Sequence, residues 1–207
     1  MSTFANSLVH PGYFPSISTF VVLAQSGHVT FETGDNFQKQ TNRNRMYIYS
    51  PNGLQLLNVP IKHVKTAHQR MRDVQLETAF DWQKQHFKSL EAAYRTSPFF
   101  EYFEDDFRPI FEKKTTCMLD LNFEIFEIVN QALGITLPYK KTTEYFHDAP
   151  DYNDFRSLVN GKKDTTQVEP YTQVFNDKHG FINNLSILDL LFNEGRYALD
   201  YLKNQQL

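Results

Sequence analysis

Hydrophobic residues in the first part of the chain occur in short runs whose period changes at turn residues. Residues 17–25, ISTFVVLAQ, predict a helix, because they follow the Pro15 turn and because Ser16 is placed to cap the helix start. Residues 28–32, HVTFE, predict a short strand. With a strand ahead of the helix, this region forms a predicted strand–helix–strand unit.

The segment 45–61, RMYIYSPNGLQLLNVPI, predicts an antiparallel hairpin. Two β-rich runs flank Pro51-Asn52-Gly53, and Asn-Gly accepts the positive φ angles that a tight turn needs. Residues 73–77, DVQLE, predict one more strand.

From Asp81 onward the hydrophobic pattern becomes helical. Asp81 can cap a helix that Pro98 stops. One face of this helix carries residues at helical spacing, namely Trp82, His86, Leu90 and Ala93.

Two further helices are predicted after Pro98. The first covers about 100–112, with Pro109 expected to end or kink it. The second covers about 116–133 and ends at Gly134, a preferred residue at helix ends.

The last part of the chain is more polar and less periodic. Residues 147–169 predict a long surface excursion, a flexible flap over a site. A final helix is predicted from Ser186 to Gly195. Taken together, the elements predict one mixed α/β domain over 1–207: a short central sheet, a strand–helix–strand unit and a hairpin, packed by several helices.

Composition narrows the class of protein. The chain has 207 residues, of which 19 are Phe and 11 are Tyr, so aromatic rings must be extensively buried or stacked. A formal charge of −3 gives no overall attraction for nucleic acid or an anionic membrane. We find neither a membrane-spanning run nor a secretory signal, and Cys117 is a lone cysteine, so we expect a cytoplasmic protein.

The densest polar stretch is 32–45, ETGDNFQKQTNRNR. If it runs extended into the hairpin, its alternate side chains project to one side, which would place together Lys39, Thr41, Arg43 and Arg45. Two guanidinium groups and an ammonium suit a carboxylate or phosphate. The alternative is a solvated strand face whose arginines pair with Glu32 or Asp35.

His86 is the candidate catalytic residue. It shares a helical stripe with Trp82 instead of facing solvent with Lys84 and Lys88, so we expect it to be half-buried. A general base or substrate donor is one interpretation, and a core histidine satisfied by hydrogen bonds is the other. The histidines form no metal-binding pattern, and the sequence lacks the usual nucleotide and serine-hydrolase motifs, so we expect neither a metal nor a cofactor.

Polar residues also precede the final helix. His179 and Asn183 lie before its amino terminus, where helices attract anions. Ser186 and Asp189 are interpreted as capping residues.

Several blocks together resemble the WbqC-like protein family, in the same order and across nearly the whole chain. They are YFPSISTF, DNFQKQTNRNRMYI, VPIKH, DWQKQHFKSLEAAYRTSPFFEYFEDDF and NLSILDLLFNEG. Members lie in bacterial polysaccharide gene clusters, such as those for O-antigen, and some are described as glycine transferases. The resemblance implies transfer of an aminoacyl or acyl group to an amino sugar.

One block departs from the family pattern. The family often has His-Gln-Pro-x-Tyr-x-Pro, whereas His10 precedes Tyr13 by only three residues, so no family role passes to His10. We interpret it as a turn residue, and Tyr13 as a pocket wall. The blocks that match contribute the other candidate substrate-binding residues, which are Asn36, Gln38, Lys39, Asn42, Arg43, Arg45 and Trp82.

The leading hypothesis is a transferase of surface-polysaccharide or amino-sugar metabolism. Arg43 and Arg45 would hold a phosphorylated or nucleotide-linked sugar, Tyr13 would line the pocket, and His86 would act as base or orienting donor. The alternatives are a non-catalytic sugar- or nucleotide-binding protein and a scaffolding subunit with an exposed aromatic patch at 99–103. The sequence leaves the oligomeric state open.

Overall fold

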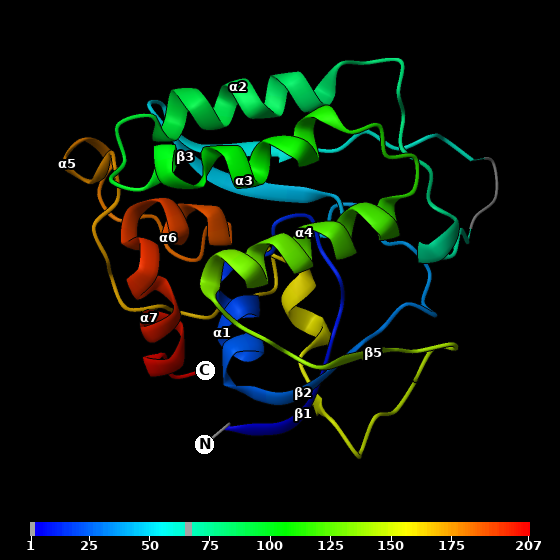
Figure 1. The fold of residues 1–207 in the computed structure, drawn as a ribbon. Helices are drawn as coiled ribbons and strands as arrows, with labels where there is room; N and C mark the ends of the chain where they lie inside the picture. Colours follow the sequence, from blue (N-terminus) through cyan, green and yellow to red (C-terminus); the bar gives the residue numbers. More distant parts are fainter. Residues whose placement is uncertain (1–2, 65–67) are drawn as a thin grey trace.

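The computed structural model describes residues 3–64 and 68–207. The fold is mixed α/β, as predicted, with a small parallel sheet, a separate antiparallel hairpin and helices packed around both (Figure 1).

The parallel sheet has the strand order β5-β2-β1-β6. β1 (Phe4–Val9) pairs in parallel with β2 (Ser26–Phe31), with Leu8 opposite Thr30. β5 (Tyr139–Lys141) adds to β2, and β6 (Asn153–Asp154) adds to the other edge of β1. The helix α1 (Ile17–Gln25) joins β1 to β2, which confirms the strand–helix–strand unit.

The hairpin consists of β3 (Arg45–Ser50) and β4 (Gly53–Asn58), as predicted. Ser50 pairs with Gly53 across a turn of two residues, and Gly53 has a φ of +93°, which a glycine adopts at little cost. The α2 helix (Trp82–Tyr94) lies beside this hairpin (Figure 1).

The prediction of a strand at 73–77 is wrong. The segment begins within a 3₁₀ turn, Met71–Asp73, and then forms only isolated bridges, Leu76 with Ile61 and Gln75 with Cys117. The Gln75 carbonyl accepts from the Lys62 amide and the Leu76 amide donates to the Thr116 carbonyl, but each neighbouring segment contributes one bridge only, so no ladder forms.

Two long helices follow α2. α3 (Phe100–Glu112) continues past Pro109, so the proline does not end it. α4 (Met118–Leu133) stops at Gly134, whose φ of +68° is left-handed, as expected of a helix-ending glycine.

The carboxyl-terminal part contains three helices. α5 (Asn176–His179) is a single turn, and α6 (Ile187–Glu194) confirms the predicted final segment. A 3₁₀ turn leads into α7 (Ala198–Asn204), which the sequence analysis did not predict. The α7 helix packs on α1, where Gln25 Nε2 donates to the Leu202 and Gln205 carbonyls at 3.0 and 2.8 Å.

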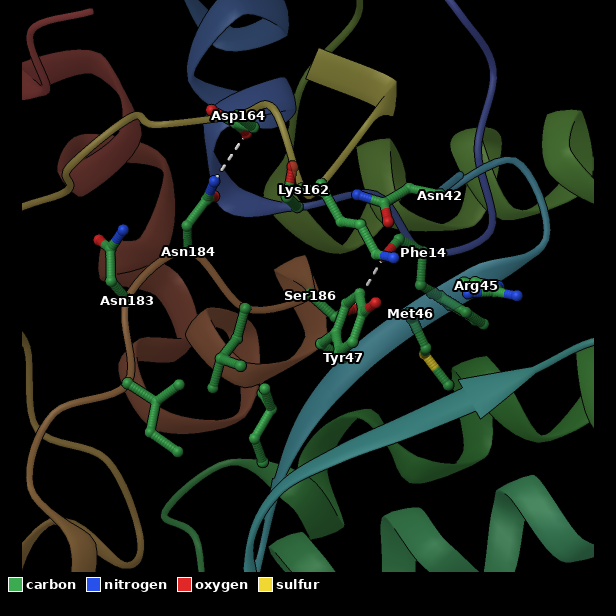
Figure 2. Close-up of a pocket in the computed structure, with 15 residues that line it drawn as sticks. Phe14, Asn42, Arg45, Met46, Tyr47, Lys162, Asp164, Asn183, Asn184 and Ser186 are labelled. Atoms are coloured by element: carbon green, nitrogen blue, oxygen red, sulfur yellow. Dashed lines mark hydrogen bonds between the residues drawn. The ribbon is translucent and has the colours of Figure 1, made fainter. Parts of the chain in front are cut away.

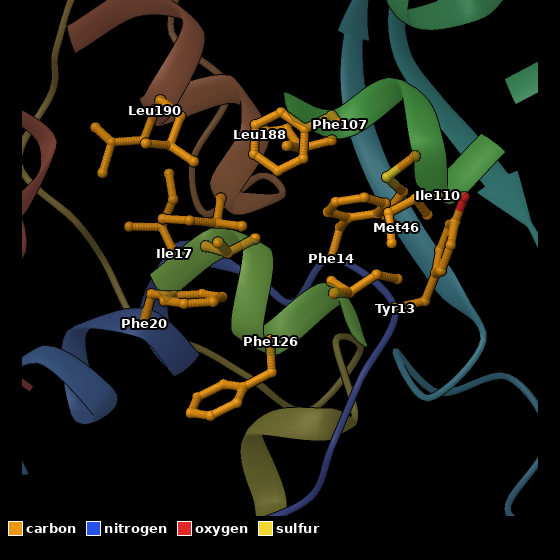
Figure 3. Packing of buried hydrophobic residues seen from close by; sticks show 14 of the residues in the cluster. Tyr13, Phe14, Ile17, Phe20, Met46, Phe107, Ile110, Phe126, Leu188 and Leu190 are labelled. Atoms are coloured by element: carbon orange, nitrogen blue, oxygen red, sulfur yellow. The ribbon is translucent and has the colours of Figure 1, made fainter. Parts of the chain in front are cut away.

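The core is built around the start of α1. Phe14 is fully buried and lies among side chains of α3 and α6, including Phe107 and Leu188 (Figure 3). Ile17 and Phe20 extend this core along α1. The many Phe and Tyr residues of the sequence thus lie largely in the interior.

Residues 147–169, predicted as a flap, contain β6 and the 3₁₀ turn Arg156–Val159. Val159 and Val168 are buried, and the Phe155 amide donates to the Leu8 carbonyl at 2.9 Å. The segment is therefore joined to the sheet, and its flexibility stays a prediction.

Among the described residues, we find no helix that is both long enough and apolar enough to cross a membrane.

Gly34 permits a close approach of two backbones after β2. A Cβ atom there would lie 2.3 Å from the Glu144 carbonyl carbon and 2.5 Å from the Tyr145 nitrogen. We expect Gly34→Ala to destabilise the fold by more than Gly134→Ala, where a Cβ meets nothing within 4 Å and only left-handed strain of about 1–2 kcal/mol opposes it. Urea denaturation measures both variants, and equal losses would contradict the close approach.

Candidate functional site

A cavity of about 300 Å³ lies where four segments that are distant in sequence meet. The loop that follows β1, the segment 42–47 and residues 161–164 form its walls together with residues 182–186 (Figure 2). Its polar lining comprises Ser16, Asn42, Arg45, Tyr47, Lys162, Asp164, Asn183, Asn184 and Ser186. We call it the first cavity.

The starts of two helices meet beside this cavity. The Ile17 amide donates to the Leu185 carbonyl, and the Ile187 amide donates to the Pro15 carbonyl, both at 2.9 Å. α1 and α6 therefore direct their amino termini, the positive ends of their dipoles, toward one place. Their first amides are already hydrogen-bonded, so the helices contribute partial positive charge and not free donors.

Asn184 links the start of α1 to the wall of the cavity. It adopts a φ of +55° and accepts a hydrogen bond from the Ser18 amide at 2.9 Å. Its Nδ2 donates to Asp164 Oδ2 at 2.7 Å, and Ser18 Oγ donates to the same oxygen at 2.6 Å. Asn184 thus caps α1, whereas the side chain of Ser16, the predicted capping residue, accepts no amide hydrogen bond.

Two cations line the first cavity. Arg45 Nε donates to Asn58 Oδ1 at 3.1 Å, and Lys162 Nζ donates to Gln40 Oε1 at 3.2 Å. Neither forms an ion pair with a described carboxylate. With two helix amino termini nearby, positive charge exceeds the single carboxylate of Asp164.

Asn42 and Asn183 are hydrogen-bonded to the segment 159–168, which contributes residues 161–164 to the cavity wall. The backbone amide of Asn42 donates to the Val159 carbonyl at 2.7 Å. The Asn183 side chain accepts from the Val168 amide at 3.0 Å and donates to the Thr166 carbonyl at 2.8 Å. The first cavity therefore brings together three predicted site residues, Asn42, Arg45 and Asn183.

Arg43 and Arg45 do not face the same volume, so that expectation is wrong. Residues 39–44 form turns and bends, and the strand begins only at Arg45, so strand alternation does not apply. Arg43 is fully buried and pairs with Asp35 at 2.5 Å. It lines a different cavity, shared with the exposed Gln38.

Lys39 and Thr41 also face elsewhere. Lys39 is exposed beside Ile61 and Lys62, at a shallow pocket apart from the first cavity. Thr41 is buried and donates to the Gln38 carbonyl at 2.8 Å.

Tyr13, Trp82 and His86 form a cluster in the core. All three are buried, and Tyr13 Oη lies 2.8 Å from His86 Nδ1. Burial raises the pKa of Tyr13 well above its usual value, so its hydroxyl is the donor and His86 Nδ1 the acceptor. Burial also lowers the pKa of His86 to about 4, which keeps the ring neutral. The geometry matches the core-histidine interpretation, because neither group reaches the first cavity.

The two remaining predicted residues lie at the surface. Asn36 is exposed, and its backbone bridges to Arg70. His179 is exposed on α5, and its Nε2 lies 3.0 Å from the Pro51 carbonyl oxygen. Neither lines the first cavity.

Sequence reasoning missed Lys162, Asp164 and Asn184 as first-cavity residues. Asn184-Leu185-Ser186 was available as a matching block, but Lys162 and Asp164 lie in the polar, aperiodic segment that carried no pattern. Within the described ranges, no group of three His, Cys, Asp or Glu residues is arranged to hold a metal ion.

Residues 10–160, which are most of the chain, match the WbqC-like protein family. The chain belongs to this family. The WbqC-like match includes Asn42, Arg45 and the loop after β1, but it ends before Asn183 and Asn184.

A curated relative is similar to this chain along nearly the whole length of both proteins. The uncharacterized protein Rv1507c of Mycobacterium tuberculosis is 29% identical over 227 residues, which cover 95% of this chain and 96% of that protein. No solved structure matches this chain significantly.

The depressed pKa of His86 predicts a pH-dependent stability. A buried histidine with a pKa of about 4, against 6.5 when unfolded, favours folding above pH 6.5, and this contribution is lost as the pH falls toward 4. The loss reaches about 3 kcal/mol at most. We expect His86→Gln to be less stable than the wild type at pH 7, with the gap narrowing toward pH 4 in urea denaturation. A gap that stays constant with pH would contradict a neutral His86.

Proposed function

We propose that this protein is a transferase that binds a phosphorylated or nucleotide-linked sugar in the first cavity. One observation carries the proposal: Arg45 and Lys162, neither paired with a described carboxylate, line one cavity beside the amino termini of α1 and α6. Guanidinium and ammonium groups bind phosphate and carboxylate oxygens, and the helix dipoles favour the same charge.

The rest of the lining suits the sugar part of such a molecule. Tyr47 is half-buried and Leu54 is exposed, so the cavity has an aromatic and an aliphatic surface. The side-chain amides of Asn42 and Asn183 line the same cavity (Figure 2), as does the Ser16 hydroxyl, and these groups can bond sugar hydroxyls. A few polar groups on a partly apolar wall are typical of small-molecule sites.

The reaction that the family resemblance implies is acyl or aminoacyl transfer to an amino sugar of a bacterial surface polysaccharide. In this proposal the sugar amine attacks the acyl carbon, the bond to the leaving group breaks, and a base takes the amine proton. Asp164 is the carboxylate in the first cavity and is the residue we assign to that role. His86 is less suited to it, since Tyr13 occupies its Nδ1 and the ring is buried.

A second candidate function is binding without catalysis. Asp164 already accepts hydrogen bonds from Ser18, Asn184 and the Thr166 amide, which favours a structural role for this carboxylate. The same cavity would then hold the sugar for another protein.

The scaffolding alternative has less support. In the 99–103 stretch Tyr102 is 75% exposed, whereas Phe100 and Phe103 are buried in the core. Tyr102 shares a pocket with Tyr197, which is 53% exposed, so exposed aromatic surface is present there. That hypothesis, however, predicts no small-molecule pocket, whereas the first cavity is one.

Binding depends on the two cations in this proposal. We expect Arg45→Met and Lys162→Met each to weaken the binding of a nucleotide-linked sugar by about 10-fold or more, because each removes a charge-assisted hydrogen bond. Isothermal titration calorimetry measures the affinities. Arg95→Met is the matched control, because Arg95 pairs with Glu91 and Glu104 and does not line the first cavity. Unchanged affinity in both cavity variants would rule out this binding site.

Turnover separates the two candidate functions. Asp164→Asn preserves the size of the side chain and removes its charge, so we expect sugar binding to persist while turnover falls by about 100-fold or more. Product formation is followed by mass spectrometry with acyl and aminoacyl donors. If the wild type binds the sugar but shows no turnover with any donor, the transferase function is excluded and binding without catalysis is the function that stands.

A further inference from the structure

A second cavity lies at the carboxyl edge of the parallel sheet. Its volume is about 370 Å³. In open α/β sheets, ligands bind outside the carboxyl ends of the strands, at the point where the strand order reverses. Here β2 and β5 extend the sheet from one edge of β1 and β6 from the other, so the reversal falls between β1 and β6. His10 follows β1 directly and Arg156 follows β6 by one residue, and both line the second cavity.

The floor of the second cavity is a buried cluster of His10, Asp35 and Arg43. Arg43 Nη2 donates to His10 Nε2 at 3.0 Å and to Asp35 Oδ2 at 2.5 Å. Because a guanidinium only donates, His10 Nε2 must accept, and the imidazole proton is on Nδ1. His10 is 9% exposed, and its Nδ1 has no hydrogen-bond partner among the described residues. Asp35 Oδ2 lies 3.6 Å from Nδ1, beyond hydrogen-bond distance.

Burial and the Arg43 charge lower the pKa of His10 to about 3, so the ring is neutral and Nδ1 is a donor. A buried donor without a partner costs free energy, and a ligand oxygen would satisfy it. The structural interpretation of His10 as a mere turn residue therefore leaves this atom unexplained.

One wall of the second cavity is held by Arg156. Its guanidinium donates to both oxygens of Asp154, at 2.6–3.1 Å, and it also contacts Glu32 and the Phe146 carbonyl. These partners fix the orientation of Arg156 at the end of β6. The ring of Tyr145 lies 5.4 Å from its guanidinium carbon.

Lys163 provides the cation without a carboxylate partner. It is exposed, it lines the second cavity, and it forms no ion pair with the described residues. Arg43 is balanced by Asp35, and Arg156 by Asp154 and Glu32. These three cations and three carboxylates balance in number, and Lys163 is the cation whose donors no described carboxylate occupies.

A single stretch of chain separates the two cavities. Asn160 and Lys163 line the second, whereas Gly161, Lys162 and Asp164 line the first. A Cβ at Gly161 would lie 3.2 Å from Asn42 Oδ1, so the glycine lets this stretch pack directly on the side chain of Asn42. The cavities are neighbours across residues 160–164.

We propose that the second cavity binds a small molecule through a carboxylate or phosphate group, which Lys163 and the His10 Nδ1–H hold at the carboxyl ends of β1 and β6. That this ligand is the second substrate of the reaction rests on the function proposed above. The oxyanion site itself rests only on the second cavity and its residues.

The test uses inorganic phosphate and succinate as separate probes at constant ionic strength, with Lys162→Met as the control for Lys163→Met. Nitrogen-15 NMR follows the His10 imidazole. We expect saturable shifts of His10 Nδ1 with at least one probe, and a 10-fold or greater loss of affinity in Lys163→Met that Lys162→Met does not share. Response to phosphate alone identifies a phosphate ligand, and response to succinate alone a carboxylate ligand.

Two outcomes would overturn the oxyanion site: no saturable shift with either probe, or equal affinities in Lys163→Met and the wild type. The proposed function fails separately. It is lost if Arg45→Met and Lys162→Met bind a nucleotide-linked sugar like the wild type, whatever happens at Lys163.

Discussion

The reciprocal backbone hydrogen bonds between Ile17 and Leu185 and between Ile187 and Pro15 are the contact on which the functional region depends. They join chain segments about 170 residues apart in sequence and bring the starts of α1 and α6 together. The loop that leads into α1 has His10 at one end and Ser16 at the other. Ser16 lines the first cavity and His10 lines the second, so the two ends of this loop face different cavities.

Buried charges then orient the side chains around this contact. Arg43 is fully buried, and removing a guanidinium from water is costly unless its donors find acceptors. Asp35 and His10 supply those acceptors. Arg156 and Asp154 form a second pair at the end of β6, in which Asp154 is exposed. Since the attraction within a buried pair is largely offset by desolvation, the Arg43–Asp35 pair determines geometry more than stability.

Local patterns predicted the elements whose signals are local. The span of α4 and its end at Gly134 follow from helical spacing and one glycine. Residues 73–77 have the propensity of a strand, but propensity cannot reveal that the segments beside them form only one bridge each. The site was harder. Helical spacing predicted a half-buried His86, and the structure buries it more fully, but burial alone does not separate a core histidine from a base. Asp164 has no periodic signal, since its position depends on Asn184, twenty residues away.

The Gly161 contact has a consequence for the arrangement of charge. With residues 160–164 packed against Asn42, the register of this stretch decides which cavity receives each side chain. Lys162 and Lys163 are chemically identical neighbours, yet each supplies positive charge to a different cavity. A shift of one residue would leave the composition unchanged and exchange these assignments. Residue order along this wall therefore carries information that composition does not.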